Sequence, residues 1–310
     1  MGCLEAAWAD PKLANVLYHD WEAGTYDEKW SISFDERCIS YARNRFVAVA
    51  GTDGWPYEKA LEVGCGTGFF LLNLKQAGVV DEAHVTDISP GMVAAAQRNA
   101  SMLGYGIEGR VADAESIPYD DHTFDLVVAH AVLHHIPDVE RAFGEALRVL
   151  RPGGRFVIAG EPTVWGDRIA RRLSRATWWL TTRAARLPLL RERWSRPVDE
   201  LVESSRAAAL EAVVDLHTFD PGELAETARR AGAADVHTVT EELTAAWFGW
   251  PVRTFEAAVN PNRLGWSWAN FAYTSWLRLS ALDRRLARVV PPWLYYNVSI
   301  TGRKPPEPVA

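Results

Sequence analysis

Short apolar runs alternate with longer amphipathic segments between residues 59 and 158. The runs end at Gly, Pro or Asp, which is typical of buried strands, and apolar residues spaced three and four apart predict helices between them. The expected strands are Lys59–Val63, Ala83–Thr86, Gly109–Ala112, Phe124–Ala129 and Arg155–Ala159, and the expected helices are Phe69–Ala77, Pro90–Leu103 and Val139–Leu150. Strands that alternate with helices in this way predict a parallel sheet with right-handed crossovers.

The pattern changes after Pro162. Residues 168–196 contain nine Arg, no Lys and one acidic residue among Leu and Trp side chains, which predicts a basic, partly amphipathic helical insertion. Four further segments follow: a helix at Glu223–Ala231, a strand at Ala234–Glu241, an aromatic-rich helical stretch at about 247–290 and a last strand at Tyr295–Thr301.

Composition and charge narrow the class of protein. The 310 residues include 33 basic and 40 acidic side chains, a net charge of −7, so a cationic surface for nucleic acid over the whole protein is not expected. Cys3, Cys38 and Cys65 form no C-x-x-C pair and have no His at zinc spacing, so neither a disulfide framework nor a metal site is predicted. The start lacks a secretory signal and no apolar run is long enough to span a bilayer, so a cytoplasmic protein is expected.

The Trp residues are distributed unevenly along the chain. None of the 14 lies between Trp55 and Trp165, and ten lie from Trp165 to Trp293. This distribution indicates a core with the alternating pattern and a differently built accessory part.

A glycine-rich turn follows the first predicted strand. Gly64, Gly66 and Gly68 lie where the ligand-binding edge of a doubly wound sheet is expected, and glycine lets the backbone approach a ligand closely. The spacing is G-x-G-x-G and differs from the dinucleotide pattern G-x-G-x-x-G, because Phe69 stands where that pattern has its last glycine. The turn contains no Lys or Arg to bind a diphosphate.

Two acidic residues follow the next strands. Asp87, after the second strand, is placed to accept hydrogen bonds from both hydroxyls of a ribose. Asp113, after the third, is placed to accept from the exocyclic amine of adenine, and Ile88 and Ala114 to hold the purine between apolar surfaces. Each acid taken alone is more often a loop residue or a helix cap, and their common position at strand ends favours a nucleoside site.

These segments resemble the successive motifs of class I S-adenosylmethionine-dependent methyltransferases, most closely the small-molecule branch of the UbiE/Coq5 type. The resemblance covers about residues 59–161 and more loosely 219–241 and 295–303. The segments are Leu61–Phe70, Val85–Met92, Asp113–Pro118, Phe124–Pro137 and Leu150–Gly154. The resemblance implies an α/β fold with a Rossmann-like, seven-stranded, mostly parallel sheet and helices on both faces. The two insertions would add a helical cap.

The resemblance also implies a cofactor, S-adenosyl-L-methionine, and the residues around it. The glycine turn and Glu62 would border the methionine moiety, Asp87 the ribose and Asp113 the adenine, with His130 facing the sulfonium end. An N-terminal segment is expected to cover the cofactor, with Tyr18 or Tyr26 over the methionine end or packed on the sheet. The cofactor-binding set is Tyr18, Tyr26, Glu62, Gly64, Cys65, Gly66, Gly68, Asp87, Ile88, Met92, Asp113, Ala114 and His130.

Methyl transfer from a sulfonium needs a base only when the acceptor is not already ionised. His130, His134 and Glu161 are the candidate catalytic residues, because His is the natural base near neutral pH and Glu161 follows the fifth strand. The alternatives are that His134 and His135 orient the loop, that His130 is a wall of the site, and that Glu161 is a helix-entry acid beside Pro162.

The basic insertion allows three interpretations: a solvated helical face, a lid over an apolar acceptor, or transient contact with an anionic membrane surface. The last two are compatible with a lipid or quinone-like acceptor and with a cytoplasmic protein peripheral to the membrane. An RNA partner is not expected, since no RNA-binding module is recognisable.

The predicted function is methylation of a small, apolar or aromatic acceptor at oxygen or carbon. A nicotinamide-dependent oxidoreductase and a non-catalytic cofactor-binding scaffold remain as alternatives. The expected division is 1–56 (N-terminal helical segment), 57–161 (cofactor-binding core), 162–215 (Arg/Trp-rich insertion), 216–246 (core continuation), 247–292 (aromatic insertion) and 293–310 (last strand and tail).

Overall fold

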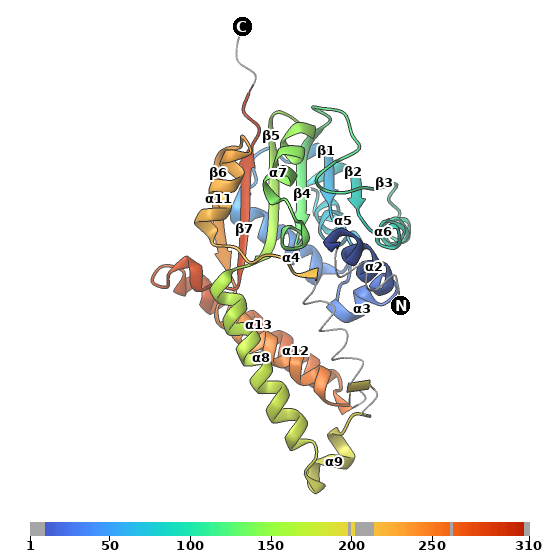
Figure 1. Cartoon of the computed structure of the whole chain (residues 1–310), viewed down its shortest axis with the longest axis vertical. Helices are drawn as coiled ribbons and strands as arrows, with labels where there is room; N and C mark the ends of the chain where they lie inside the picture. Colours follow the sequence, from blue (N-terminus) through green and yellow to red (C-terminus); the bar gives the residue numbers. More distant parts are fainter. Residues whose placement is uncertain (1–9, 198–199, 202–213, 261–262, 307–310) are drawn as a thin grey trace. The chain divides into compact units, whose positions relative to one another are not determined.

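The computed structural model describes residues 10–197, 200–201, 214–260 and 263–306 (Figure 1). The chain divides into two units. Unit 1 comprises Met1–Glu161, Val213–Val239 and Ser299–Ala310, and unit 2 comprises Pro162–Ala212 and Thr240–Val298. Cys3, which the sequence analysis considered, lies outside the described residues.

A seven-stranded sheet forms the centre of unit 1 and confirms the predicted fold class. Its order is β3-β2-β1-β4-β5-β7-β6. The pairs β1/β2, β1/β4, β2/β3 and β4/β5 are parallel. The strands are β1 Tyr57–Val63, β2 Val80–Asp87, β3 Glu108–Val111, β4 Phe124–His130, β5 Leu150–Pro162, β6 Ala234–Glu241 and β7 Asn297–Arg303.

β5 begins earlier than the sequence predicts. The predicted strand begins at Arg155, yet β5 starts at Leu150. Leu150 pairs with Phe124 and Arg155 pairs with Leu126, so the intervening residues form an irregularity in the register. Gly153 has φ +78°, a conformation that glycine adopts without steric cost, which lets the strand absorb the extra residues.

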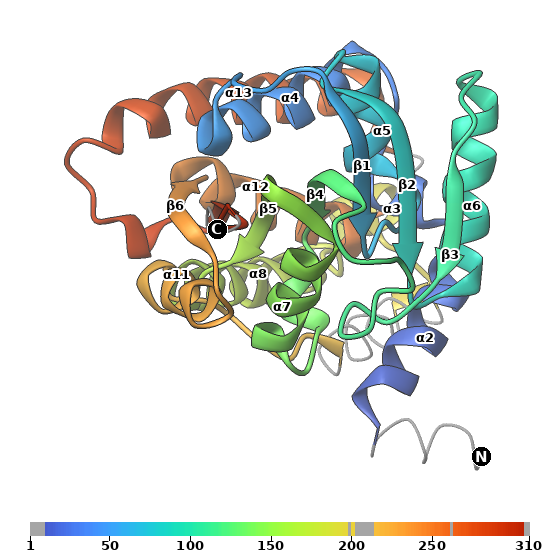
Figure 2. The same cartoon turned by 90° about the horizontal axis from the view of Figure 1, so that it is seen from above.

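Helices cover both faces of the sheet (Figure 2). α4 and α5 lie on one face, and α7 and α11 lie on the other. This arrangement follows from right-handed crossovers between parallel strands. The helices of unit 1 are α2 Pro11–Glu22, α3 Tyr26–Trp30, α4 Glu36–Ala50, α5 Phe69–Gln76, α6 Pro90–Met102, the short 3₁₀ helix η1 Leu133–His135, α7 Val139–Val149 and α11 Pro221–Arg230.

The core of unit 1 lies where the central strands meet these helices. Leu126, Val127 and Val128 on β4 are almost fully buried, as a strand covered on both faces requires. Phe46 of α4 and Phe70 of α5 are also fully buried. The apolar runs of the sequence therefore form the buried strands of the sheet, and polar residues such as Asp87 and His130 stand at the strand ends.

Unit 2 is helical. Its elements are α8 Val164–Ala184, α9 Pro188–Trp194, α12 Thr244–Ala258, α13 Trp266–Leu286 and the 3₁₀ helix η3 Pro292–Leu294. α12 packs against both α8 and α13. The buried Asp283 of α13 accepts hydrogen bonds from the backbone N–H groups of Leu243, Thr244 and Ala245 at 2.9–3.0 Å and so caps the start of α12. None of the helices in the described part of the chain is long and apolar enough to cross a membrane.

Candidate functional site

The glycine turn joins β1 to α5 in a conformation that only glycine adopts easily. Gly64, Gly66 and Gly68 have φ of +62°, +51° and +84°. A Cβ atom on Gly64 would lie 2.5 Å from Cγ1 of Val132, and a Cβ on Gly68 would lie 2.8 Å from Cδ1 of Leu72. These two glycines are therefore needed for close packing as well as for the turn.

Gly66 differs from its two neighbours because space remains beside it. A Cβ on Gly66 would meet only the ring of Tyr26, at 3.8 Å. α3, which carries Tyr26, is tied to the turn by Asp27, whose Oδ1 accepts from the Thr67 hydroxyl at 2.5 Å and whose Oδ2 accepts from Nδ2 of Asn99 at 3.1 Å. Asp27, which no sequence motif indicated, thereby positions the aromatic side chain over the turn.

Asp87 ends β2 and its carboxylate faces the glycine turn. Its Oδ2 accepts from the backbone N–H of Gly66 and its Oδ1 from that of Ser89, both at 2.9 Å. Burial raises the pKa of Asp87 to about 6, and the nearby charge of Asp20 acts in the same direction. Each carboxylate oxygen has two acceptor positions, so the group that fixes the turn can also accept hydroxyl groups of a ribose.

α2 lies against the start of α6 through a second acid that no sequence motif indicated, Asp20. Asp20 Oδ1 accepts from the Ser89 hydroxyl at 2.5 Å and from the backbone N–H of Gly91 at 2.8 Å. Ser89 in turn caps α6, because its hydroxyl accepts from the Met92 N–H at 3.1 Å. Met92, predicted to contact the cofactor, is 1% exposed and belongs to the buried core.

Asp113 has a cationic partner from a distant segment. Nζ of Lys12 on α2 lies 2.6 Å from Oδ2 of Asp113 and 2.7 Å from Oε2 of Glu115. Ile88 and Ala114, predicted to hold the purine, are half-buried at the ends of β2 and β3. The predicted adenine acceptor is therefore present at the expected strand end with its carboxylate paired to Lys12, a partner 101 residues away.

Glu62 and Cys65 are both buried, and their contacts are structural. Oε2 of Glu62 accepts from the backbone N–H of Leu71 at 3.2 Å, in the first turn of α5, where Gly68 has no side chain to act as a cap. Burial raises the pKa of Glu62 to about 8, and the nearby Asp87 contributes. Burial also raises the pKa of the Cys65 thiol, which is a poor nucleophile as a result.

His130 ends β4 among aromatic rings. Its ring centroid lies 5.3 Å from those of Phe69 and Phe70, and its Nε2 lies 3.4 Å from the Tyr41 hydroxyl. Burial lowers the pKa of His130 to about 3, with Arg45 acting in the same direction. The imidazole is therefore neutral at physiological pH, suited to donate or accept a hydrogen bond and poorly suited to hold a proton.

Glu161 organises the loop after β4. The carboxylate is fully buried; its Oε1 accepts from the backbone N–H groups of Val132 and Leu133 at 2.8 and 2.9 Å. Oε2 accepts from the His134 backbone at 3.2 Å and lies 2.8 Å from Nδ1 of the same His. Because a carboxylate only accepts, Nδ1 carries the proton and donates it, which leaves Nε2 as the acceptor atom of the His134 ring.

Three more polar side chains surround His134. Oδ1 of Asp215 lies 3.8 Å from Nε2 of His134 and 3.7 Å from Nδ1 of His135. Nδ1 of His135 lies 2.9 Å from the Val214 carbonyl, and the His19 ring packs edge-on against His135. Burial lowers the pKa of His135 below its ordinary value and that of His19 to about 4. Asp215 carried no signal in the sequence, since it follows no predicted strand.

Of the two predicted N-terminal tyrosines, only Tyr26 meets the glycine turn. Tyr18 is 6% exposed and packs with Ala14 and Val214, and its hydroxyl accepts from Nζ of Lys29 at 3.1 Å. The strand ends thus bring together the glycine turn, Asp87, His130, Glu161 and His134. Tyr18 instead packs α2 against Val214, which precedes Asp215 in the sequence.

Comparison with known proteins supports one of the predicted classes. Residues 61–158 match the family model described as "Methyltransferase domain". The matched residues make up about a third of the chain. The match confirms the class I methyltransferase resemblance and S-adenosylmethionine as the cofactor of this domain, and it covers the glycine turn, Asp87, Asp113 and His130. It also disfavours the nicotinamide alternative.

The matched segment also has curated relatives. A demethylmenaquinone methyltransferase of Thermus thermophilus is 36% identical over 105 residues, which are 34% of this chain and 48% of that protein. The 27-O-demethylrifamycin SV methyltransferase of Amycolatopsis mediterranei is 35% identical over 33% of this chain and 38% of that protein. The chain thus spans about half, or less, of the length of these relatives.

A solved structure supports the fold. A phosphoethanolamine N-methyltransferase of Haemonchus contortus is 14% identical with a TM-score of 0.53, over 86% of this chain and 53% of that chain. At this identity the likeness concerns the fold alone.

Proposed function

We propose that the chain transfers the methyl group of S-adenosylmethionine to a small apolar or aromatic acceptor, at oxygen or carbon. The observation that carries the proposal is the Gly64–Gly68 turn fixed by Asp87 inside a matched methyltransferase domain. The residues fit the cofactor, because Gly66 leaves space under Tyr26, Asp87 offers acceptor positions for hydroxyls, and residues 61–70 lack the basic side chains that a diphosphate needs. The two curated relatives are named for demethylmenaquinone and 27-O-demethylrifamycin SV, which supports a ring-bearing acceptor.

Positioning is the first contribution of the protein. When bound, S-adenosylmethionine supplies a methyl group on a positively charged sulfur, which an acceptor attacks in line. Glu161 holds the backbone of Val132, Leu133 and His134, and Val132 packs against Gly64. One buried carboxylate thereby couples the position of the acceptor-side loop to that of the cofactor turn.

We assign proton transfer to His134. Glu161 accepts from Nδ1 and orients the ring, so Nε2 is the atom that takes the acceptor's proton. The negative charges of Glu161 and Asp215 stabilise the imidazolium that forms. His130, whose pKa is about 3, would be a wall and hydrogen-bond partner of the acceptor.

A panel of phenols, hydroquinones and quinone-derived lipids incubated with S-adenosylmethionine tests the activity. Formation of S-adenosylhomocysteine together with a singly methylated product is expected. Cofactor binding without turnover across the panel would instead favour the scaffold alternative. A melting temperature raised by NADH and unchanged by S-adenosylmethionine would favour the oxidoreductase.

His134→Ala, with the exposed His237→Ala as its control, tests the base. Turnover of a neutral phenol should fall by about 10²–10⁴-fold, the usual contribution of general base catalysis, with unchanged cofactor affinity. A phenol acidic enough to be ionised at the assay pH should largely escape this loss. Equal losses for both phenols would show that His134 acts only through the loop.

A further inference from the structure

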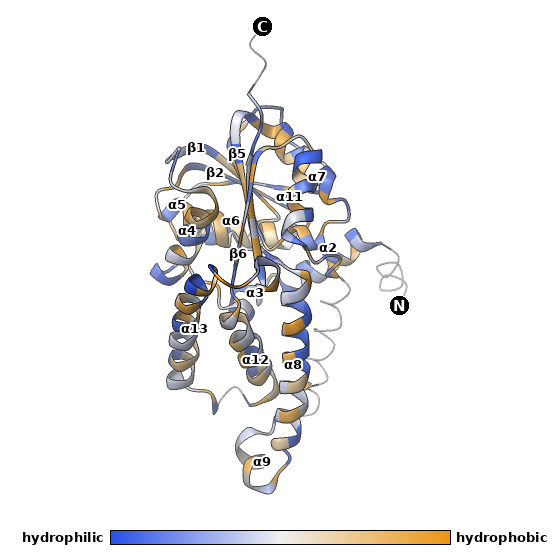
Figure 3. Ribbon diagram, turned by 90° about the vertical axis from the view of Figure 1, so that its left-hand side faces the viewer, coloured by the Kyte–Doolittle hydropathy of each residue, from blue (hydrophilic) through white to orange (hydrophobic). Residues whose placement is uncertain are grey.

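One face of α8 in unit 2 presents arginine and tryptophan to solvent. Trp165, Arg168, Arg172, Arg175, Trp179 and Arg183 are all exposed, and they follow one another at intervals of three or four residues. Such residues lie along one side of a helix. We call this set the Arg/Trp stripe. Figure 3 shows hydrophilic and hydrophobic residues interleaved along α8.

The stripe combines positive charge with large apolar area. Trp165 and Trp179 are 44% and 52% exposed, and the adjacent Leu180 is 59% exposed. The guanidinium of Arg168 lies 4.6 Å from the Trp165 ring centroid, and that of Arg183 lies 4.3 Å from the Trp179 centroid. These cation–π contacts pair each exposed indole with a guanidinium.

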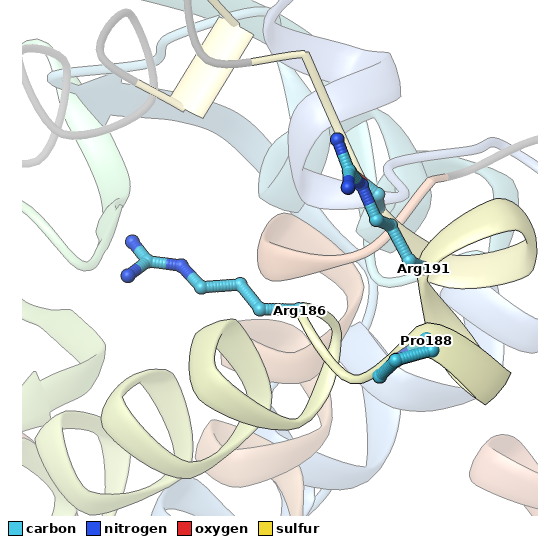
Figure 4. A pocket seen from close by; sticks show the side chains of 4 residues that line it. Arg186, Pro188 and Arg191 are labelled. Atoms are coloured by element: carbon cyan, nitrogen blue, oxygen red, sulfur yellow. The ribbon is translucent and has the colours of Figure 1, made fainter.

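Positive charge is concentrated on this segment although the whole chain is acidic. Residues 168–196 hold nine Arg and one acidic residue, within a protein of net charge −7. Arg186 and Arg191, with Pro188 and Ser195, line a hollow of about 480 Å³ at the junction of α8 and α9 (Figure 4). Leu187, which lies between Arg186 and Pro188 in the sequence, is 55% exposed. The basic and apolar features therefore continue past the end of α8.

An anionic bilayer is the partner that matches both the positive charge and the exposed apolar side chains of this segment. Arg side chains are attracted to anionic lipid head groups, Trp favours the membrane–water interface, and exposed Leu gains by entering the acyl boundary. A second copy of the chain joined by two-fold symmetry would bring these arginines close to their own counterparts, which like-charge repulsion opposes. RNA would use Arg and Trp, but it offers no apolar region to Leu180 or Leu187.

We propose that unit 2 binds the surface of anionic membranes through the Arg/Trp stripe. α8 lies parallel to the bilayer, with Trp165, Trp179 and Leu180 at the level of the head groups and the arginines on lipid phosphates. The proposal goes beyond methyl transfer and does not depend on it, because binding is measured without cofactor or acceptor.

Co-sedimentation of the full chain with vesicles tests the proposal. The protein should bind phosphatidylcholine vesicles that contain phosphatidylglycerol, bind pure phosphatidylcholine vesicles much less, and be released by high salt. The triple variant Arg168→Gln, Arg172→Gln, Arg175→Gln should partition roughly 100-fold more weakly, since each Arg near an anionic surface contributes about fivefold. Trp165→Ala with Trp179→Ala should also weaken binding, at any salt concentration.

The control variant loses the same three positive charges from unit 1 instead of from the Arg/Trp stripe. Arg43, Arg98 and Arg229 are exposed on unit 1, and their triple change to Gln should leave vesicle binding close to that of the wild type. Circular dichroism melts establish that each variant is folded. Equal loss in the two triple variants, wild-type binding by the stripe variant, or no vesicle binding by the wild type would overturn the proposal. So would binding of an RNA homopolymer, or a concentration-dependent dimer, without vesicle binding.

Discussion

Replacement of Asp87 by Asn separates the cofactor role of this residue from its role in folding. The wild-type carboxylate is 7% exposed and accepts from two backbone N–H groups. Burial moves its pKa from 3.8 to about 6, which corresponds to about 3 kcal/mol of unfavourable ionisation in the folded state. Asn carries no charge and so removes this cost of ionisation. It has only one acceptor oxygen, however, so the backbone N–H of either Gly66 or Ser89 loses its partner, which should lower the free energy of unfolding by about 1–3 kcal/mol.

The two effects depend differently on pH. The folded-state pKa of Asp87 is raised, so the stability that its protonated form provides is fully present below pH 3.8 and is lost as the pH rises through about 6. The lost hydrogen bond in Asp87→Asn is independent of pH. The variant should therefore be clearly less stable than the wild type in acid and approach it in stability at about pH 8.

Cofactor affinity should respond in the opposite way. If Asp87 binds the ribose as predicted, its ionised form accepts the hydroxyls, so its replacement should weaken S-adenosylmethionine binding by about 1.5–3 kcal/mol at about pH 8, which is roughly 10–150-fold. Urea unfolding of the cofactor-free protein at several pH values and calorimetric titration with S-adenosylmethionine measure the two quantities. Unchanged affinity would refute the ribose assignment. A stability difference that does not vary with pH would refute the burial argument.

Two further substitutions examine the turn and the end of β4. Gly64→Ala should destabilise the fold by about 2–5 kcal/mol, because its Cβ would lie 2.5 Å from Val132 and φ is +62°. Gly78→Ala is the control, because Gly78 has φ +73° and a Cβ there would meet no atom within 4 Å. It should lower the free energy of unfolding in urea by only about 1–2 kcal/mol and leave cofactor affinity unchanged. A Gly64→Ala loss no larger than that of Gly78→Ala would mean that Val132 moves aside. His130→Ala should lower turnover by about tenfold or more with little change in cofactor affinity, and equal losses in both would remove it from the acceptor side. With the pKa of His130 at about 3, the wild-type rate should show no His130 titration above about pH 5.

The sequence by itself located the strands and turns of the segment that we predict to bind the cofactor. Each motif there is local: a strand, a glycine turn and the start of a helix lie within ten residues, and strand ends of a parallel sheet meet at one edge whatever the rest of the chain does. Gly64, Gly66, Gly68 and Asp87 could be located for this reason. The start of β5 could not, because the register irregularity at Gly153 depends on pairing with β4.

Only the tertiary structure decided which side chains meet these motifs. Lys12 meets Asp113, Asp27 meets Thr67, and Asp215 meets His134 across separations of 101, 40 and 81 residues. No periodicity links residues so far apart, since their approach depends on how helices and loops pack on the sheet. The same holds for the Arg/Trp stripe: the sequence supplies nine Arg and the Trp residues, but packing of α12 against α8 decides which of them remain on the solvent side.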